Sequence, residues 1–124
     1  MTKFLAVAAG GSIGASLRYF ISLFFINHTH LKFPYATFIV NLSGCFLIGL
    51  FYSFFSERVI SVELRLFIIT GFLGALTTFS TYNFENLMLM KEKFFITGIV
   101  YFLLSNAAGI LLIAAGIRIG NLFK

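Results

Sequence analysis

Residues 94–119 read FFITGIVYFLLSNAAGILLIAAGIRI, a run in which Arg118 is the only charged side chain. A helix needs about 20 mainly apolar residues to cross the hydrocarbon core of a bilayer, so this run is long enough to span a membrane. Three more runs of the same character precede it, at residues 4–26, 35–55 and 66–90. The sequence therefore predicts an all-α integral membrane protein with four transmembrane helices.

The residues outside these four runs are too few to form a soluble domain. Of the 124 residues, 60% are hydrophobic and only 10% charged, whereas charged residues make up about 25% of a typical soluble domain. The connections cover residues 28–34, 56–63 and 91–93, so neighbouring helices must alternate in direction. We expect a single membrane domain over residues 1–124, and we expect it to oligomerise because one copy is too small to enclose an aqueous route.

The charge and the reactive side chains favour lipid over nucleic acid and argue against an enzyme. The net charge is +5, but the basic residues are scattered at the predicted helix ends, which indicates membrane lipids rather than nucleic acid as partners. Cys45 is the only cysteine, so no intrachain disulfide can form. His28 and His30 lie in the first loop, as solvated residues or as a metal site. No nucleophile, base and orienting group occur together, so we predict no enzymatic activity.

The third run contains an unusual stretch, GFLGALTTFST at residues 71–81, with two glycines and four hydroxyl residues. Such a stretch predicts a helix that is broken near the middle of the membrane. Unwound backbone at this depth is where carbonyl groups bind cations and amide groups bind anions. The alternative is a continuous helix whose hydroxyls bond back to its own carbonyls.

Two other runs carry polar residues at helical spacing. Thr37, Asn41 and Gly44 share one face of the second run, where the Asn41 amide could donate to an anion or join two helices. Tyr101 and Ser105 lie one turn apart on the fourth run, with Asn106 beside them. This pair forms either a ladder of hydroxyl donors for a dehydrated anion or an ordinary packing face with an interfacial aromatic.

Apart from Arg118 near the end of the fourth run, two charged residues lie inside the predicted spans. Arg18 is well inside the first run, so its side chain either snorkels to the interface or faces a water-filled vestibule that attracts anions. Glu85 lies near the end of the third run, and it could carry protons, pair with a base or accept hydrogen bonds near a pore mouth. The sequence does not decide among these roles.

Three stretches resemble one family, the small bacterial fluoride channels known as Fluc or CrcB. They are GGSIGASLRY at residues 10–19, TFIVNLSG at residues 37–44 and GFLGALTTFST at residues 71–81. The resemblance implies a fluoride-selective channel that passively exports fluoride and relieves its toxicity, as a multi-pass protein of the bacterial plasma or inner membrane. It also implies an antiparallel, dual-topology homodimer with two fluoride pathways.

The resemblance further assigns roles to individual residues. It implies a structural sodium ion at the dimer centre, held by the backbone carbonyls of Gly74 and Thr77. For the ion pathway it implies the donors Asn41, Tyr101 and Ser105, with Arg18 near the entrance. Thr37 joins this predicted pathway because it shares a helix face with Asn41.

Two aromatic positions complete the predicted pathway. The family's two pore phenylalanines fall at Phe79 and at position 82, where this chain has Tyr82 instead. The edge of a phenyl ring carries the positive end of its quadrupole, so edge contact with an anion is physically favourable. A tyrosine keeps that edge and adds a hydroxyl, whose role the sequence leaves open.

Two other classes of function compete with the fluoride channel. A small multidrug-type, proton-coupled exporter would also have four helices, but it needs an acid buried in the membrane, and the first run contains none. Small residues four positions apart, such as Gly10 with Gly14 and Gly116 with Gly120, predict close helix packing. A structural or assembly subunit would explain these glycines, but it leaves the polar residues of the spans without a role.

The distribution of basic residues predicts insertion in both orientations. Orientation follows the excess of Lys and Arg in short cytoplasmic loops. One side of the membrane would carry five such residues and the other side three, which is a weak bias. The first group is Lys3, Arg58, Arg65, Arg118 and Lys124, and the second is Lys32, Lys91 and Lys93.

Overall fold

The computed structural model describes residues 1–28, 32–56 and 58–123, and all regular structure in these ranges is helical. His30 and Lys124, which the sequence interpretation names, lie outside the described residues. The elements in chain order are α1 (Thr2–His28), α2 (Tyr35–Ser56), α3 (Val62–Arg65), the π-helical segment η1 (Leu66–Leu73), α4 (Gly74–Leu76), α5 (Phe79–Lys91) and α6 (Phe95–Asn121).

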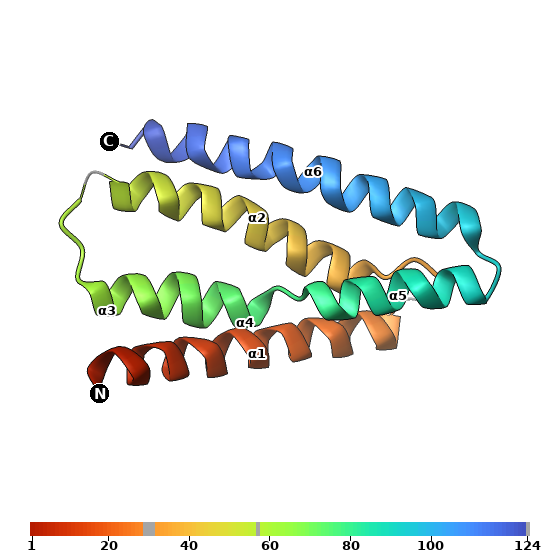
Figure 1. Cartoon of the computed structure of the whole chain (residues 1–124), viewed down its shortest axis with the longest axis horizontal. Helices are drawn as coiled ribbons and strands as arrows, with labels where there is room; N and C mark the ends of the chain where they lie inside the picture. The colour runs from red at the N-terminus through yellow and green to blue at the C-terminus, as the bar shows by residue number, and fades with distance from the viewer. Residues whose placement is uncertain (29–31, 57, 124) are drawn as a thin grey trace.

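Four helical spans run alongside one another, with both chain termini at the same end of the bundle (Figure 1). Each span is long and apolar enough to cross a membrane; the third is composed of α3, η1, α4 and α5. Three of the four predicted runs lie within the observed helical spans, and the fourth begins one residue before α6.

The helices pack as two close pairs in which glycines let the backbones touch. α2 makes its most extensive contacts with α6, and α1 packs on η1 and α4. In the first pair, a Cβ atom built on Gly116 would lie 2.2 Å from the Phe46 carbonyl oxygen. In the second pair, a Cβ on Gly10 would lie 2.2 Å from the Phe67 carbonyl oxygen. These glycines therefore set how closely the spans approach, as small residues commonly do in membranes.

Gly10→Ala should destabilise the protein, whereas Gly11→Ala should leave its stability nearly unchanged. The added methyl at Gly10 collides with backbone that cannot move freely, and such overpacking costs about 1–3 kcal/mol. At the neighbouring Gly11 the nearest atom to a built Cβ is 3.9 Å away, so this variant is the matched control. Thermal unfolding in detergent measures both, and equal midpoints for the two variants would contradict the packing described here.

The third span changes its backbone geometry along its length. The Ser61 hydroxyl caps its start by accepting from the Leu64 N–H at 3.3 Å. The helix then widens to the π form in η1 and ends at Leu76. Thr77 (φ −79°, ψ 155°) and Thr78 (φ −148°, ψ 117°) are extended, and α5 starts at Phe79. Two residues therefore separate two helical segments of the same span.

Large apolar side chains cover the outside of the bundle. Phe20 on α1 is 67% exposed and Ile110 on α6 is 70% exposed, while the buried cores are small clusters around Val40 and Tyr101. An apolar exterior of this kind suits a lipid environment rather than water. At one end of the bundle, the His28 ring forms a hydrogen bond with the Phe24 carbonyl at 2.7 Å.

Candidate functional site

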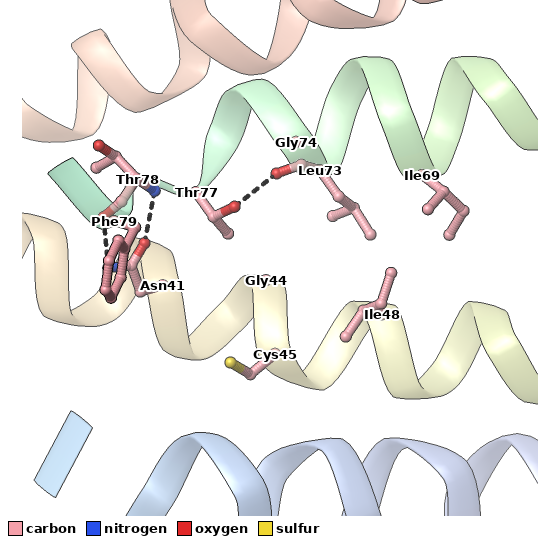
Figure 2. Close-up of a pocket in the computed structure, with 10 residues that line it drawn as sticks. All are labelled: Asn41, Gly44, Cys45, Ile48, Ile69, Leu73, Gly74, Thr77, Thr78 and Phe79. Carbon is pink, nitrogen blue, oxygen red and sulfur yellow. Dashed lines mark hydrogen bonds between the residues drawn. The ribbon is translucent and has the colours of Figure 1, made fainter. Parts of the chain in front are cut away.

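Asn41 on α2 holds the extended residue Thr78 through both of its side-chain polar atoms. The Thr78 N–H donates to Asn41 Oδ1 at 2.8 Å, and Asn41 Nδ2 donates to the Thr78 carbonyl at 3.1 Å. Figure 2 shows the two bonds side by side. The side chain replaces the helical partners that Thr78 lacks, so unwound backbone is satisfied without water.

This arrangement also frees main-chain oxygens. In a continuous α-helix the Thr78 N–H would bond to the Gly74 carbonyl, but here it donates to Asn41 instead. The Thr77 carbonyl accepts a bond of 3.4 Å from Arg18 Nη1, and a carbonyl oxygen has a second lone pair for another partner. The Gly74 carbonyl thus loses its α-helical partner, and the Thr77 carbonyl, just after the end of α4, keeps one lone pair beside its bond to Arg18.

A cavity of about 350 Å³ opens beside the interruption, between the second and third spans. Asn41, Gly44 and Cys45 line it from α2, and Gly74, Thr77 and Phe79 line it from the third span (Figure 2). The Phe79 side chain is 77% exposed, although it follows directly on a residue that is fixed by two hydrogen bonds. An exposed aromatic at the mouth of a cavity is available to a partner or a ligand.

Glu85 links two of the predicted pathway residues. Its carboxylate accepts from the Thr37 hydroxyl at 2.7 Å and from the Tyr101 hydroxyl at 2.9 Å. Both donors are buried. Of the three roles that the sequence leaves open for Glu85, hydrogen-bond acceptor is the one seen in this structure. The Tyr101 hydrogen is therefore already used, and the Tyr101 oxygen remains as an acceptor.

The remaining hydroxyls of the pathway differ in their partners. The Ser105 Oγ is buried and has no hydrogen-bond partner among the described residues. The Tyr82 ring packs against the Tyr101 ring edge to face, with centroids 5.1 Å apart. Its hydroxyl accepts from Asn106 Nδ2 at 3.0 Å. Ser105 is thus the predicted donor with an unengaged hydroxyl.

Arg18 is not among the residues that line the first cavity. It lines a second cavity of about 260 Å³ between α1, α2 and the start of α5, together with Ser22, Thr37, Thr78 and Thr81. Thr78 Oγ1 accepts from the Thr81 N–H at 3.3 Å and so caps α5. The second cavity is therefore polar and holds one guanidinium group, while the first is mainly apolar.

Comparison with known proteins places the chain in a family. The family model described as "CrcB-like protein, Camphor Resistance (CrcB)" matches residues 5–117. The chain belongs to the CrcB family.

Curated CrcB relatives match it over nearly their whole length. One from Trichormus variabilis is 41% identical over 95% of this chain and 88% of the relative. One from Acidobacterium capsulatum is 42% identical over 96% of both, and one from Desulfotalea psychrophila is 43% identical over 96% and 92%. Each of the three is named fluoride-specific ion channel FluC. The resemblance drawn from the three sequence motifs is confirmed, and the chain is a multi-pass bacterial membrane protein.

The structure of this CrcB chain brings some predicted site residues together and separates others. Asn41, Gly74, Thr77 and Phe79 line one cavity. Thr37 and Tyr101 meet through Glu85, and Arg18 lies in the second cavity. The roles of these residues toward an ion stay predictions.

Sequence reasoning missed two features of this CrcB chain. The first is that Asn41 binds the backbone of Thr78, 37 positions along the chain; the sequence offered only two separate polar sites. The second is the pairing of Asn106 with Tyr82. A polar residue in the middle of an apolar helix was the available signal, because such residues rarely lack a partner in a membrane.

Proposed function

We propose that this chain is the subunit of a fluoride-selective channel that lets cytoplasmic fluoride leave the cell passively and so relieves its toxicity. The proposal rests on one observation: the family match covers the same residues that form the site. Curated relatives at 41–43% identity are named fluoride-specific ion channels, and the match includes all the residues that form the site described above. We propose a single membrane domain over residues 1–124 and no enzymatic activity.

The chemistry of the predicted pathway suits a small, strongly hydrated anion. Its donors are neutral amide and hydroxyl groups, namely Asn41, whose amide has a second hydrogen, and Ser105, whose hydroxyl has no partner among the described residues. Neutral donors can replace water around fluoride without binding the ion too tightly to leave. We assign Thr37 and Tyr101 to the same pathway, with Glu85 orienting both, and Arg18 to its entrance.

The exposed ring of Phe79 supports a homodimer. A 77% exposed aromatic beside an open cavity is incomplete in one copy, and a second copy would cover both. We propose that the ring edges of Phe79 and Tyr82 contact the anion in pathways built from both subunits. Positive ring edges favour this contact.

We also propose a structural sodium ion at the dimer centre. The residues fit, because sodium takes oxygen ligands as other hard cations do. The Gly74 carbonyl loses its α-helical N–H partner to Asn41, and the Thr77 carbonyl, which accepts from Arg18, keeps a second lone pair. Two carbonyls are too few to replace a hydration shell, so the second copy must supply more.

The dimer should unfold at a higher temperature in a sodium buffer than in an N-methylglucamine buffer, because only sodium fills the proposed site. Equal unfolding temperatures would contradict the proposal.

The two subunits are proposed to insert in opposite orientations. Both termini and the second loop lie at one end of the bundle (Figure 1), so the described basic residues at this end are Lys3, Arg58, Arg65 and Arg118, against Lys32, Lys91 and Lys93 at the other. This difference in basic residues is only a weak bias toward one orientation.

Reporter fusions at the C-terminus should give signal on both sides of the membrane. Signal from one side alone would refute dual insertion.

A proton-coupled exporter is the weaker alternative. Glu85 is the candidate proton carrier, but two hydroxyls already donate to its carboxylate. An acid that is held as a hydrogen-bond acceptor in this way does not favour proton coupling.

Liposomes that contain only the purified protein test the proposal. With equal outward gradients, fluoride should leave rapidly and chloride should be retained, because the pathway offers few neutral donors rather than fixed positive charge. Protein-free liposomes are the control. Equal rates for the two halides, or no fluoride release, would overturn the proposal.

A further inference from the structure

Asn106 has both of its amide hydrogens engaged, which fixes the orientation of the side chain. Its Nδ2 lies 2.7 Å from the Phe102 carbonyl one turn earlier on α6 and 3.0 Å from the Tyr82 hydroxyl on α5. A carbonyl can only accept a hydrogen bond, so the atom facing it must be the amide nitrogen rather than Oδ1. The same nitrogen must then donate to Tyr82.

The direction of this bond determines what the Tyr82 hydroxyl can do. A phenol oxygen that accepts from an amide keeps its own hydrogen for another acceptor. Among the hydrogen bonds of the described residues, the Tyr82 hydroxyl takes part only as an acceptor. The hydroxyl is therefore an oriented donor without an acceptor in the described part of one chain.

The surroundings of this donor indicate the interior of an assembly or a water-filled route rather than lipid. The Tyr82 ring is only 6% exposed and lies beside Phe79, with ring centroids 6.1 Å apart. Asn106 is exposed in a single chain, although it lies near the middle of the α6 span. Polar residues at that depth almost always face the interior of an assembly or a water-filled route, because lipid cannot satisfy them. The adjacent Ser105 also has an unengaged hydroxyl.

We propose that the Tyr82 hydroxyl is an additional hydrogen-bond donor to the permeating anion in this protein, and that Asn106 is the residue that positions it. The inference rests on the proposed function. A Phe at position 82 would keep the ring and lose the donor. Without the Asn106 amide, the Tyr82 hydroxyl would still be present, but its orientation would no longer be fixed. The two side chains should therefore act as one unit, so their substitutions should not be additive.

Fluoride efflux from liposomes at a series of fluoride concentrations tests this. Tyr82→Phe should raise the half-saturating fluoride concentration about fivefold, as expected for one hydrogen bond. Asn106→Leu should give a similar rise, and the double variant should give no further rise. Tyr52→Phe is the matched control, because Tyr52 is 63% exposed on α2 and should behave as wild type.

The outcomes separate this inference from the proposed function. Wild-type protein that moves no fluoride overturns the channel itself. Wild-type flux with an unchanged half-saturating concentration in Tyr82→Phe overturns only the donor role of the hydroxyl. Additive effects of the two substitutions overturn the positioning role of Asn106. Should Asn106→Leu not assemble, Tyr82→Phe still decides the proposal, because Phe keeps the ring and its packing.

Discussion

Asn41→Ala is expected to reduce fluoride flux at least about 30-fold. The substitution removes both hydrogen bonds that hold the backbone of Thr78. Leaving two partly buried backbone groups unpaired inside a membrane span costs about 2 kcal/mol or more, and each 1.4 kcal/mol corresponds to a factor of ten. The extended backbone conformation of Thr77 and Thr78 should therefore become rare, and the carbonyls of Gly74 and Thr77 should lose their arrangement. Initial fluoride efflux from liposomes measures the effect.

Ser43→Ala is the matched control for this substitution. Ser43 is also a polar residue of α2, but it is exposed and its hydroxyl donates only to carbonyls of its own helix, those of Ile39 and Val40. Its flux should stay within about twofold of wild type, since side chains that touch only their own helix contribute little. Asn41→Ala with wild-type flux would show that the Thr78 backbone does not need this side chain.

Phe79→Ile is expected to reduce fluoride flux about tenfold without unfolding the dimer. The side chain is 77% exposed in one chain, so it contributes little to the fold of the subunit. Isoleucine lacks the positive ring edge, and an aromatic edge contact of about 1.5 kcal/mol corresponds to about a factor of ten. Efflux rate and thermal midpoint, measured on the same preparation, separate the two effects.

Phe84→Ile on the same helix controls for the general loss of an aromatic side chain. Phe84 is 62% exposed, and it lines a different cavity, together with Lys32, Glu85 and Glu92. Its flux should resemble wild type. Equal losses in Phe79→Ile and Phe84→Ile would mean that Phe79 has no special relation to the ion.

Much of the architecture follows from the sequence because lipid imposes a simple constraint. A backbone in the membrane must satisfy its own polar groups, so long apolar runs become helices. The run at residues 94–119 corresponds to α6, at Phe95–Asn121. The close approach of Gly10 and Gly116 to neighbouring backbone was also expected from their spacing.

The contacts between the residues of the site could not be predicted from the sequence and became visible only in the structure. The sequence marked Asn41 and the hydroxyl-rich stretch as unusual, but no local pattern pairs a side chain with a backbone group 37 residues away. The same holds for Glu85, which joins Thr37 to Tyr101 across three helices. The helical periodicity of a sequence predicts which face of its helix a residue occupies, whereas the hydrogen-bond partners of that residue depend on how the helices pack.

The reversal potential of the current through purified protein in a planar bilayer shows which ion the protein conducts. Fluoride, chloride and pH are each made unequal across the bilayer, one at a time. We predict a current that reverses at the equilibrium potential of fluoride and does not shift with the chloride or pH gradient. A reversal potential that follows chloride, or one that moves with the pH gradient as proton coupling requires, would contradict it.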